Sequence, residues 1–372
     1  MNSIKGINTN KMNHRERVLL TINHKQPDHP PAFATLTPQM AKMLSDYMGL
    51  PYEEPIDSLL STRISHTGLL TKLGNDLIGV AACYPDTYPT KVLEDGTLRN
   101  EWGMQFKDSG LYNEFYKYPL DHAVAVREII DYPFPEVEAH GRFDFSSKQI
   151  TKYKTDYPII GDLETSIFET AWYLVGLEKF LIDMIMENKY IDSLLDKIMD
   201  INIGIGKKLI QLGVDIIWCG DDFGSQHGMI MDPENWRSVF KPRIGHMFKE
   251  FRRINPEIKI AWHSCGSILP IIPDFIELGL DILNPLQPLA QGMKPEFLKS
   301  EYGKDLVFFG GIDVQELLPN ASADAVKKEV IRVCQIYGEG GGFIAAPAHN
   351  IQPDTPVANV LAMYEGIRES FD

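Results

Sequence analysis

A histidine and a cysteine two positions apart stand at the end of a short apolar run, in the stretch 258–266 (IKIAWHSCG). The run predicts a buried strand, and Gly266 permits a sharp backbone bend directly after His263 and Cys265. Imidazole nitrogen and thiolate sulfur are the usual zinc ligands, so a bend that turns both side chains toward one point would make half of a metal site. The structural alternative is a histidine that packs at the edge of the core, beside a buried cysteine that packs as a small hydrophobic residue.

The composition predicts a globular chain with a sizeable core. The chain has 372 residues, of which 44% are hydrophobic and 23% charged, and barrel folds of this length form one domain. Its net charge is −15, and no block rich in lysine and arginine is present, which argues against a nucleic-acid partner.

Cysteine usage and hydropathy place the chain in the cytoplasm. Cys83, Cys219, Cys265 and Cys334 are too scattered for a disulfide framework. The N-terminus lacks the apolar core of a signal peptide, and no apolar run approaches the ~20 residues that span a bilayer. We therefore expect a soluble cytoplasmic protein with no membrane partner.

Eight short apolar runs follow one another along the chain, nearly all separated by helical patterns. Runs such as 306–311 (LVFFGG) are continuously apolar, which is typical of strands covered on both faces. Eight parallel strands alternating with helices form a (β/α)8 barrel, also called a TIM barrel. A doubly wound open sheet is the main alternative, but the G-x-G-x-x-G fingerprint that such sheets often carry is absent. The runs are 31–36, 76–85, 158–163, 214–222, 258–266, 281–287, 306–313 and 341–349.

Residues 84–156 interrupt this alternation after the second run. Their first part predicts a β-hairpin with Asp95-Gly96 as its turn, and the rest is rich in proline and aromatic residues. We interpret 84–156 as an insertion within a single barrel domain that spans 1–372. Residues 1–13 are polar and predict a flexible N-terminus, with Asn13 as a candidate cap of the first helix.

Polar residues stand at the ends of six of the eight runs. In barrels of this kind the chemistry lies at the C-terminal ends of the strands, so these residues should share one cleft. His349, after the eighth run, is a candidate third metal ligand beside His263 and Cys265, because catalytic zinc sites keep three protein ligands and one open position. Its alternative is a loop histidine bonded to Asp354.

Three acidic residues are candidates for catalysis: Glu164 after the third run, Asp221 after the fourth and Asp313 after the seventh. Adjacent strand residues point to opposite faces, so only one of Asp221 and Asp222 should reach the cleft. Asp222 has the alternative of capping the next helix or forming a turn. The same alternative exists for Asp313, since aspartate caps helices well. Glu164, Asp221 or Asp222 could also give a metal an oxygen ligand.

The order and spacing of several motifs resemble those of the uroporphyrinogen decarboxylase superfamily. The motifs are GDxE at 161–164, GDDxG at 220–224 with PENWRSVFKPR downstream, HSCG at 263–266, FFGGID at 308–313, and APAHNIQPDTPVANVLAMYE from 346 onward. The likeness runs from about residue 14 to the C-terminus and implies a (β/α)8 barrel.

Two chemistries occur in this superfamily. True uroporphyrinogen decarboxylases carry an arginine-bearing segment of the RQAGRY type that grips substrate carboxylates, whereas the equivalent residues 30–49 contain no arginine. The resemblance is closer to the branch of cobalamin-dependent methyltransferases that use zinc. Those enzymes carry a His-x-Cys pair after the fifth strand, which His263 and Cys265 match, and usually a cysteine where this chain has His349.

The resemblance implies methyl transfer between a small methylated substrate, of the methoxy, methylthio or methylamine type, and the cobalt of a corrinoid. Zinc would polarise the substrate heteroatom, and Glu164 or Asp221 would protonate the leaving group or orient the substrate. Aromatic residues could hold a ring of the substrate: Phe33, Tyr84, Phe168 and Trp172.

The sequence has no cobalamin-binding signature of the DxHxxG type, so we expect a separate corrinoid protein to dock over the barrel mouth, near 84–156. A homodimer is compatible with the family. The alternative function is a metal-independent decarboxylase or lyase acting on a smaller acid, with Asp221 or Asp313 holding a pyrrole-like or amine nitrogen. A binder without catalysis would not need so many polar strand ends.

Overall fold

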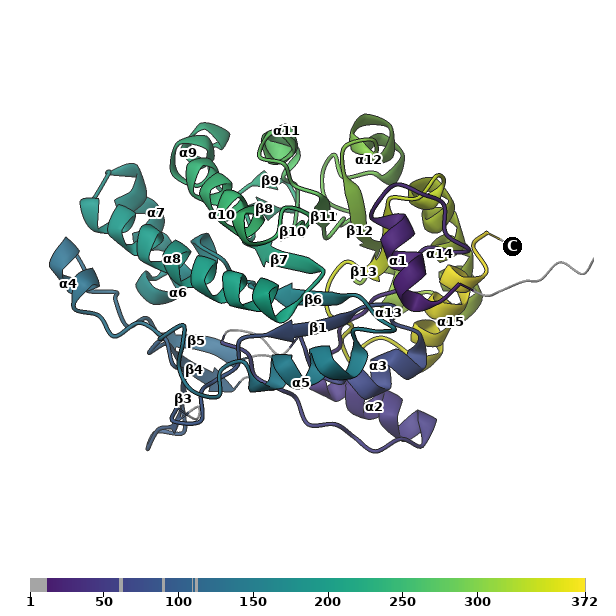
Figure 1. The fold of residues 1–372 in the computed structure, drawn as a ribbon, viewed down its shortest axis with the longest axis horizontal. Helices are drawn as coiled ribbons and strands as arrows, with labels where there is room; N and C mark the ends of the chain where they lie inside the picture. Colours follow the sequence, from purple (N-terminus) through teal and green to yellow (C-terminus); the bar gives the residue numbers. More distant parts are fainter. Residues whose placement is uncertain (1–11, 60–62, 89–90, 109, 111–112, 372) are drawn as a thin grey trace, which may run out of the picture.

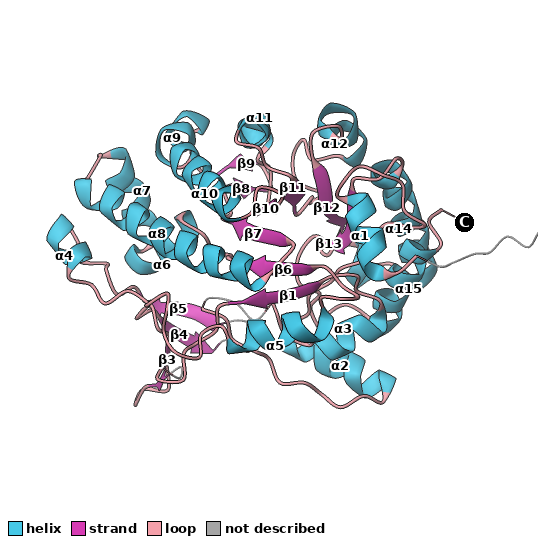
Figure 2. Ribbon diagram, in the orientation of Figure 1, coloured by secondary structure: helices cyan, strands magenta, loops and turns pink. Residues whose placement is uncertain are grey.

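Seven strands of the computed structural model form one parallel sheet that curls around a central space, with helices on its outside (Figure 1, Figure 2). The structure describes residues 12–59, 63–88, 91–108, 110 and 113–371. The strands follow chain order within the sheet, and each pair of neighbours is parallel. They are β1 (Ile78–Ala81), β6 (Ile159–Asp162), β7 (Ile216–Gly220), β10 (Lys259–His263), β11 (Ile282–Asn284), β12 (Val307–Ile312) and β13 (Phe343–Pro347).

Residues 31–36, where the sequence predicts the first of eight strands, close the ring between β13 and β1. Ala32 forms a parallel bridge with Ala345 of β13. On the other side, the Asp76 N–H donates to the Ala32 carbonyl at 2.8 Å, and the Asp76 carboxylate accepts the Ala32 N–H at 2.7 Å. The Asn75 side chain adds bonds of 2.9 and 3.0 Å to the same segment. The predicted barrel is therefore confirmed, with side chains replacing part of the backbone ladder at one junction.

Helices alternate with the strands and lie on the outside of the sheet (Figure 2). The longest, α8 (Lys189–Leu212), buries residues at helical spacing such as Ile191, Leu194, Leu195 and Ile198, and ends at Gly213 with φ +103°. The other helices are α1 (His14–Thr21), α2 (Pro38–Met48), α3 (Thr67–Leu73), α4 (Val126–Ile130), α5 (Asp144–Tyr153), α6 (Phe168–Val175), α7 (Leu177–Ile185), α9 (Pro233–Val239), α10 (Lys241–Ile254), the 3-10 turn η1 (Leu269–Ile271), α11 (Ile272–Glu277), α12 (Pro295–Tyr302), α13 (Leu317–Asn320), α14 (Ala323–Gly338) and α15 (Val357–Arg368).

The core has two parts because successive strand residues point to opposite sides of the sheet. On β7, Ile216 and Trp218 belong to the cluster inside the barrel, whereas Ile217 and Cys219 belong to the layer between sheet and helices. Ala261 of β10 lies inside, which places His263 on the inward side of that strand as well. The alternation therefore decides which side chains at the strand ends face the barrel mouth.

The excursion between β1 and β6 contains a four-stranded antiparallel sheet beside the barrel (Figure 1). Its strands are β2 (Lys91–Val92), β3 (Leu98–Arg99), β4 (Gln105–Asp108) and β5 (Asn113–Lys117). The predicted hairpin turn is present: the Leu93 N–H donates to the Thr97 carbonyl at 2.8 Å, and Gly96 has φ +79°. A separate two-stranded ribbon, β8 (Gly224–Ser225) and β9 (Gly228–Met229), follows β7. The single-domain organisation stays a prediction.

The N-terminal expectation, a flexible stretch over 1–13, lies outside the described residues except at its end. There Asn13 caps α1 as predicted, since its side chain accepts the Glu16 N–H at 2.8 Å. None of the helices in the described part of the chain is both long and apolar enough to cross a bilayer.

Candidate active site at the mouth of the barrel

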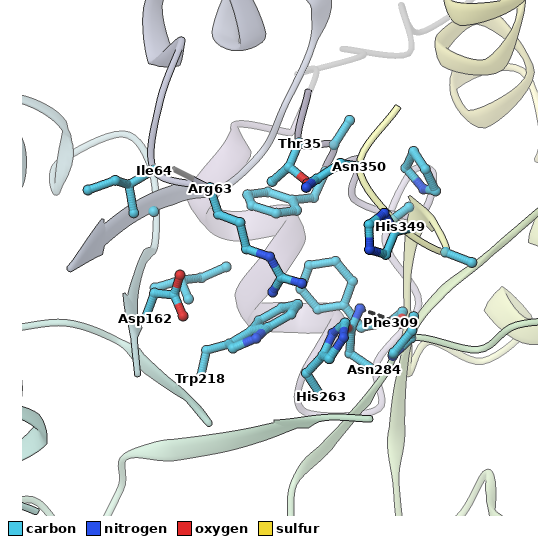
Figure 3. A pocket seen from close by; sticks show the side chains of 18 residues that line it. Thr35, Arg63, Ile64, Asp162, Trp218, His263, Asn284, Phe309, His349 and Asn350 are labelled. Carbon is cyan, nitrogen blue, oxygen red and sulfur yellow. Dashed lines mark hydrogen bonds between the residues drawn. The ribbon is translucent and has the colours of Figure 1, made fainter. Parts of the chain in front are cut away.

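A cavity lies at the C-terminal ends of the strands. Aromatic side chains form much of its wall, with Phe33 and Trp218 each packed edge-on against Phe309 at ring distances of 5.4 and 5.0 Å. Polar groups from several strand ends and loops face the same space (Figure 3). The polar lining residues are Thr35, Arg63, Asp162, His263, Asn284, His349 and Asn350.

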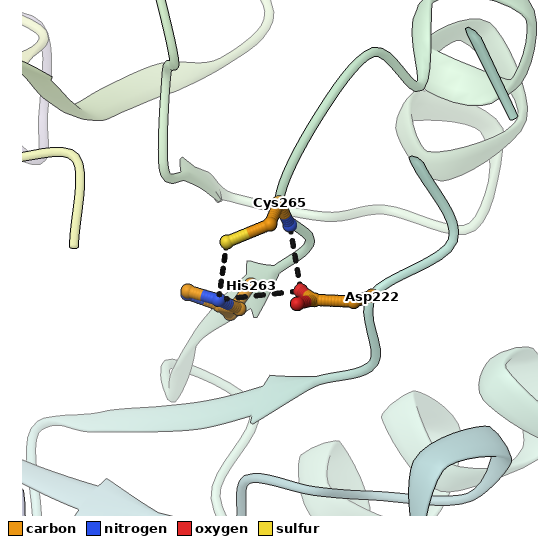
Figure 4. A group of neighbouring side chains, drawn as sticks. All are labelled: Asp222, His263 and Cys265. Atoms are coloured by element: carbon orange, nitrogen blue, oxygen red, sulfur yellow. Dashed lines mark hydrogen bonds and ion pairs between the residues drawn. The ribbon is translucent and has the colours of Figure 1, made fainter. Parts of the chain in front are cut away.

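His263 and Cys265 do turn toward one point, and Asp222 joins them there (Figure 4). One ligand atom from each of the three residues lies within 4.8 Å of the other two. His263 Nε2 is 3.4 Å from Cys265 Sγ and 3.4 Å from Asp222 Oδ1. The Cys265 N–H also donates to Asp222 Oδ1 at 2.7 Å, which fixes the loop after β10 against the loop after β7.

Gly266 makes the bend possible, as the sequence predicts. Its φ is +76°, and a Cβ at this position would lie 2.5 Å from the backbone carbonyl carbon of Gly224. Any side chain would therefore push the two loops apart and separate Cys265 from Asp222.

Asn284, at the end of β11, decides which nitrogen of His263 faces the cluster. The Asn284 amide nitrogen donates to the Phe309 carbonyl at 2.9 Å, so its oxygen is the atom that faces His263 Nδ1 at 2.6 Å. That oxygen can only accept, which places the imidazole proton on Nδ1 and leaves the Nε2 lone pair directed at Cys265 and Asp222. Histidine ligands of metals are commonly oriented in this way.

Burial and nearby charges shift the pKa values of the three residues in the cluster. Burial, and then the nearby Arg63 charge, lower the pKa of His263, which favours the neutral imidazole. Burial and the Asp222 charge raise the pKa of the Cys265 thiol. Burial alone would raise the pKa of Asp222, but the Cys265 N–H that donates to it and the Arg63 charge oppose burial, and the pKa is lowered. A neutral nitrogen, a sulfur and a carboxylate oxygen that converge form a donor set that fits a transition metal such as zinc.

Glu164 follows β6 and lies beside this cluster, in contact with two residues that line the cavity, Trp218 and Arg63. Its Oε1 is 3.5 Å from His263 Nε2, and its Oε2 accepts the Trp218 indole N–H at 2.8 Å. Arg63 forms an ion pair with the same Oε2 and lies over the Trp218 ring, 5.9 Å from its centroid. Arg63 is a site residue that the sequence did not single out, because it lies in the loop before α3 and follows no strand.

The neighbouring carboxyl of Asp162 also lines the cavity. Burial raises its pKa to about 6, against the opposing charges of Arg63 and His263. It accepts the backbone N–H of Glu164 at 2.9 Å and so shapes the turn that presents that residue.

His349 lines the same cavity but lies on a different side of it from His263 (Figure 3). Among the described residues, the group of converging ligand atoms contains Asp222 and does not contain His349. Burial, then the charges of Arg63 and His263, lower the pKa of His349 to about 4, so its ring is neutral. The assignment of His349 as third metal ligand stays a prediction, and the geometry favours Asp222.

Asp221 points away from the cluster, on the side of β7 that faces the helices. Both of its oxygens accept the Ile167 N–H, at 3.1 and 3.0 Å, and one accepts the Glu169 N–H at 3.0 Å. Burial raises its pKa to about 7. The carboxyl holds the start of α6 in place, and the structure does not bring it together with His263 and Cys265.

Asp313 is engaged in the same manner after β12. Its carboxylate accepts the backbone N–H groups of residues 315–317, at 3.2, 2.8 and 2.8 Å. This is the capping alternative that the sequence left open. Phe33 is the only one of the four expected aromatic residues in the described cavity lining, while Phe168 is buried against Phe223 and Phe240.

Some of the known proteins that the chain resembles are methyltransferases. The methylcobamide:CoM methyltransferase MtaA of Methanosarcina barkeri is 23% identical over 212 residues, which cover 57% of this chain and 58% of that protein. The methylated-thiol–coenzyme M methyltransferase of Methanosarcina mazei is 23% identical over 219 residues, or 59% of this chain and 55% of that protein. The matched part thus spans little more than half the length of these relatives.

A solved structure, described as a methyltransferase from Methanosarcina mazei, has the same fold. It covers 97% of this chain and 99% of its own length with a TM-score of 0.68 at 21% identity. Residues 121–370 match the family described as uroporphyrinogen decarboxylase (URO-D). The chain therefore belongs to the uroporphyrinogen decarboxylase family, and the relatives named here lie in its methyltransferase branch.

Proposed function

We propose that the protein is a zinc-dependent methyltransferase that moves a methyl group between a small methylated substrate and a corrinoid carried by a separate protein. The observation that carries this proposal is the convergence of His263, Cys265 and Asp222 beside a cavity at the barrel mouth. The names of the relatives, which refer to methylcobamide and to thiols, support the class of reaction.

His263, Cys265 and Asp222 would hold the zinc, which acts when bound as a Lewis acid that makes a heteroatom a better leaving group. The remaining residues position the substrate and its proton. Glu164, held by Trp218 and Arg63, presents Oε1 to His263 Nε2 at 3.5 Å. When the substrate is demethylated, we assign to Glu164 Oε1 the role of the general acid that protonates the departing heteroatom.

The aromatic wall serves to exclude water. Phe33, Trp218 and Phe309 pack against one another around the reacting end of the cavity. A dry wall prevents hydrolysis of a reactive methyl group and strengthens the interactions of Glu164 and Arg63 with the substrate. The corrinoid partner would approach the open mouth, beside the excursion between β1 and β6.

Elemental analysis of the protein, purified under reducing conditions, tests the proposal. We expect about one zinc per chain in the wild type, and loss of the metal in His263→Ala and Cys265→Ala. Cys83→Ala is the matched control, because it removes a thiol outside the cluster and should leave the zinc content unchanged. A folded wild-type protein without metal would contradict the proposal.

The second part of the test is the reaction itself. Zinc-loaded protein mixed with free methylcobalamin and a thiol should change the absorption of the cobalt, and a chelator should abolish the change. The alternative of a metal-independent decarboxylase predicts activity that survives chelation. We do not favour it, because Asp221 and Asp313, its candidate acids, are bonded to backbone amides.

A further inference from the structure

Arg63 projects into the middle of the cavity, between Asp162 and Trp218 on one side and His349 on the other (Figure 3). Among the described residues that line the cavity, it carries the one permanent positive charge. The guanidinium lies across the Trp218 ring, and the side chain is 18% exposed, so the charge is shielded from bulk water. A shielded guanidinium beside a binding cavity is a strong site for an oxyanion.

We propose that Arg63 recognises an anionic group, a carboxylate or a sulfonate, on the methylated substrate. The identity of this ligand as a methyl donor or acceptor rests on the proposed function. The aromatic wall would take the apolar part of the molecule, and Arg63 would fix its charged end. The methylated heteroatom would then face the cluster at His263.

The ion pair between Arg63 and Glu164 gives this recognition a second consequence. Glu164 Oε2 forms the ion pair with Arg63 and also accepts the Trp218 N–H, while Glu164 Oε1 faces His263 Nε2. An incoming anion competes with Glu164 for the guanidinium. Glu164 keeps its bond to Trp218 but loses part of the charge that stabilises it as an anion, so it becomes a better proton donor next to the reacting atoms.

The same charge selects against methylammonium donors. Aromatic walls bind quaternary ammonium groups through their ring faces, but Arg63 already covers the face of Trp218. A cationic substrate would also meet a like charge in a shielded site. Of the three donor types that the sequence left open, Arg63 favours methoxy and methylthio compounds with an acidic group.

Calorimetric titration with matched thioethers tests the proposal. The probes are 3-(methylthio)propanoate, its neutral amide, the corresponding 3-(methylthio)propylammonium ion, and 2-(methylthio)ethanesulfonate as the sulfonate arm. For the wild type, we expect at least one anion to bind about tenfold or more tightly than the amide, and the ammonium ion to bind most weakly. Whichever of the two anions binds more tightly shows whether Arg63 prefers a carboxylate or a sulfonate.

Variants separate charge recognition from general damage. Arg63→Gln should abolish the preference for the anion, and Arg63→Lys should retain part of it. Glu164→Gln should tighten anion binding, because it removes the competing carboxylate. Arg127→Gln, which removes an exposed guanidinium on α4, is the control and should bind like the wild type.

Three results would overturn the proposal. The wild type could bind the amide and both anions equally, it could bind neither anion, or the preference for the anion could survive in Arg63→Gln. Binding of the anions can be measured with or without zinc, so a protein that shows no preference for anions leaves the proposed function standing. Absence of zinc and of methyl transfer, in contrast, contradicts only the proposed function.

Discussion

Asn284 controls the cluster at the scale of single residues, because its fixed amide selects the tautomer of His263. We predict that Asn284→Leu weakens zinc binding by about 10- to 100-fold, since the imidazole loses its orientation and its Nδ1 proton loses an acceptor. Competition with a chromogenic chelator measures the change. Asn284→Asp is the matched control, because its carboxylate still accepts from Nδ1 and should retain most of the affinity. Unchanged affinity in Asn284→Leu would contradict the role.

The third metal ligand is a separate question at this scale. We predict that Asp222→Ala lowers the zinc content, because it removes an oxygen 3.4 Å from His263 Nε2. His349→Ala should leave the zinc content unchanged, since His349 lies outside the converging group. Metal analysis of both variants decides between Asp222 and His349. Loss of zinc in His349→Ala but not in Asp222→Ala would make His349 the third ligand.

The sequence predicted the His263 and Cys265 pair but named Asp221 among the catalytic acids, whereas the structure brings Asp222 to that pair. The strand before them is apolar on both faces, so nothing in 214–219 shows which alternate residues face the barrel. The structure supplies that information through Trp218, which lies inside and shares its side of β7 with Asp222. Arg63 was not predictable because its place depends on the path of the loop before α3.

At the scale of elements, two predicted catalytic acids, Asp221 and Asp313, accept backbone N–H groups where helices start. We predict that Asp313→Ala lowers the free energy of unfolding by about 1 kcal/mol, because three backbone N–H groups lose their acceptor. Chemical denaturation measures this loss. Asp313→Asn, which keeps an acceptor oxygen, should recover part of it. Loss of zinc in Asp313→Ala, with the fold intact, would instead indicate a role in the site.

The strands were predictable because most are continuous apolar runs bounded by polar turns. The first was less so, since residues 31–36 make only isolated bridges and depend on Asn75 and Asp76 for their remaining bonds. Such pairing between a backbone and distant side chains leaves no periodic signal in the sequence. The hairpin was recognisable from Asp95-Gly96, but the two further strands that extend it were not.

At the scale of the whole molecule, Arg17 ties α1 to the barrel. It bonds both oxygens of Asp28, at 2.7 and 2.8 Å, and Asp76 at 2.7 Å. Burial alone would raise the pKa of Asp28, but the hydrogen bonds and charge of Arg17 outweigh it and lower that pKa. A carboxyl whose pKa is lower in the folded state stabilises the protein above its unfolded pKa, near 3.9, and loses this effect as the pH falls through the folded value.

We therefore predict that Asp28→Asn lowers the melting temperature at pH 7, and that the difference from the wild type shrinks as the pH falls below about 4. Thermal unfolding across this range measures the difference. Asp46→Asn is a suitable control, because its carboxylate pairs with Lys42 on the exposed face of α2 and should change little at any pH. A constant difference between Asp28→Asn and the wild type would refute the assignment.

The closure of the ring by Asn75 and Asp76 gives the barrel a preferred line of local unfolding. A continuous backbone ladder must break many bonds together before it opens, whereas residues 31–36 are held to residues 75–76 by two side chains and by one backbone bond, from the Asp76 N–H to the Ala32 carbonyl. Amide hydrogen exchange should accordingly begin at Ala32 and Ala34, before the amides of β6 and β7. Phe33 lies on this segment and in the wall of the cavity, so each such opening would also briefly hydrate the cavity.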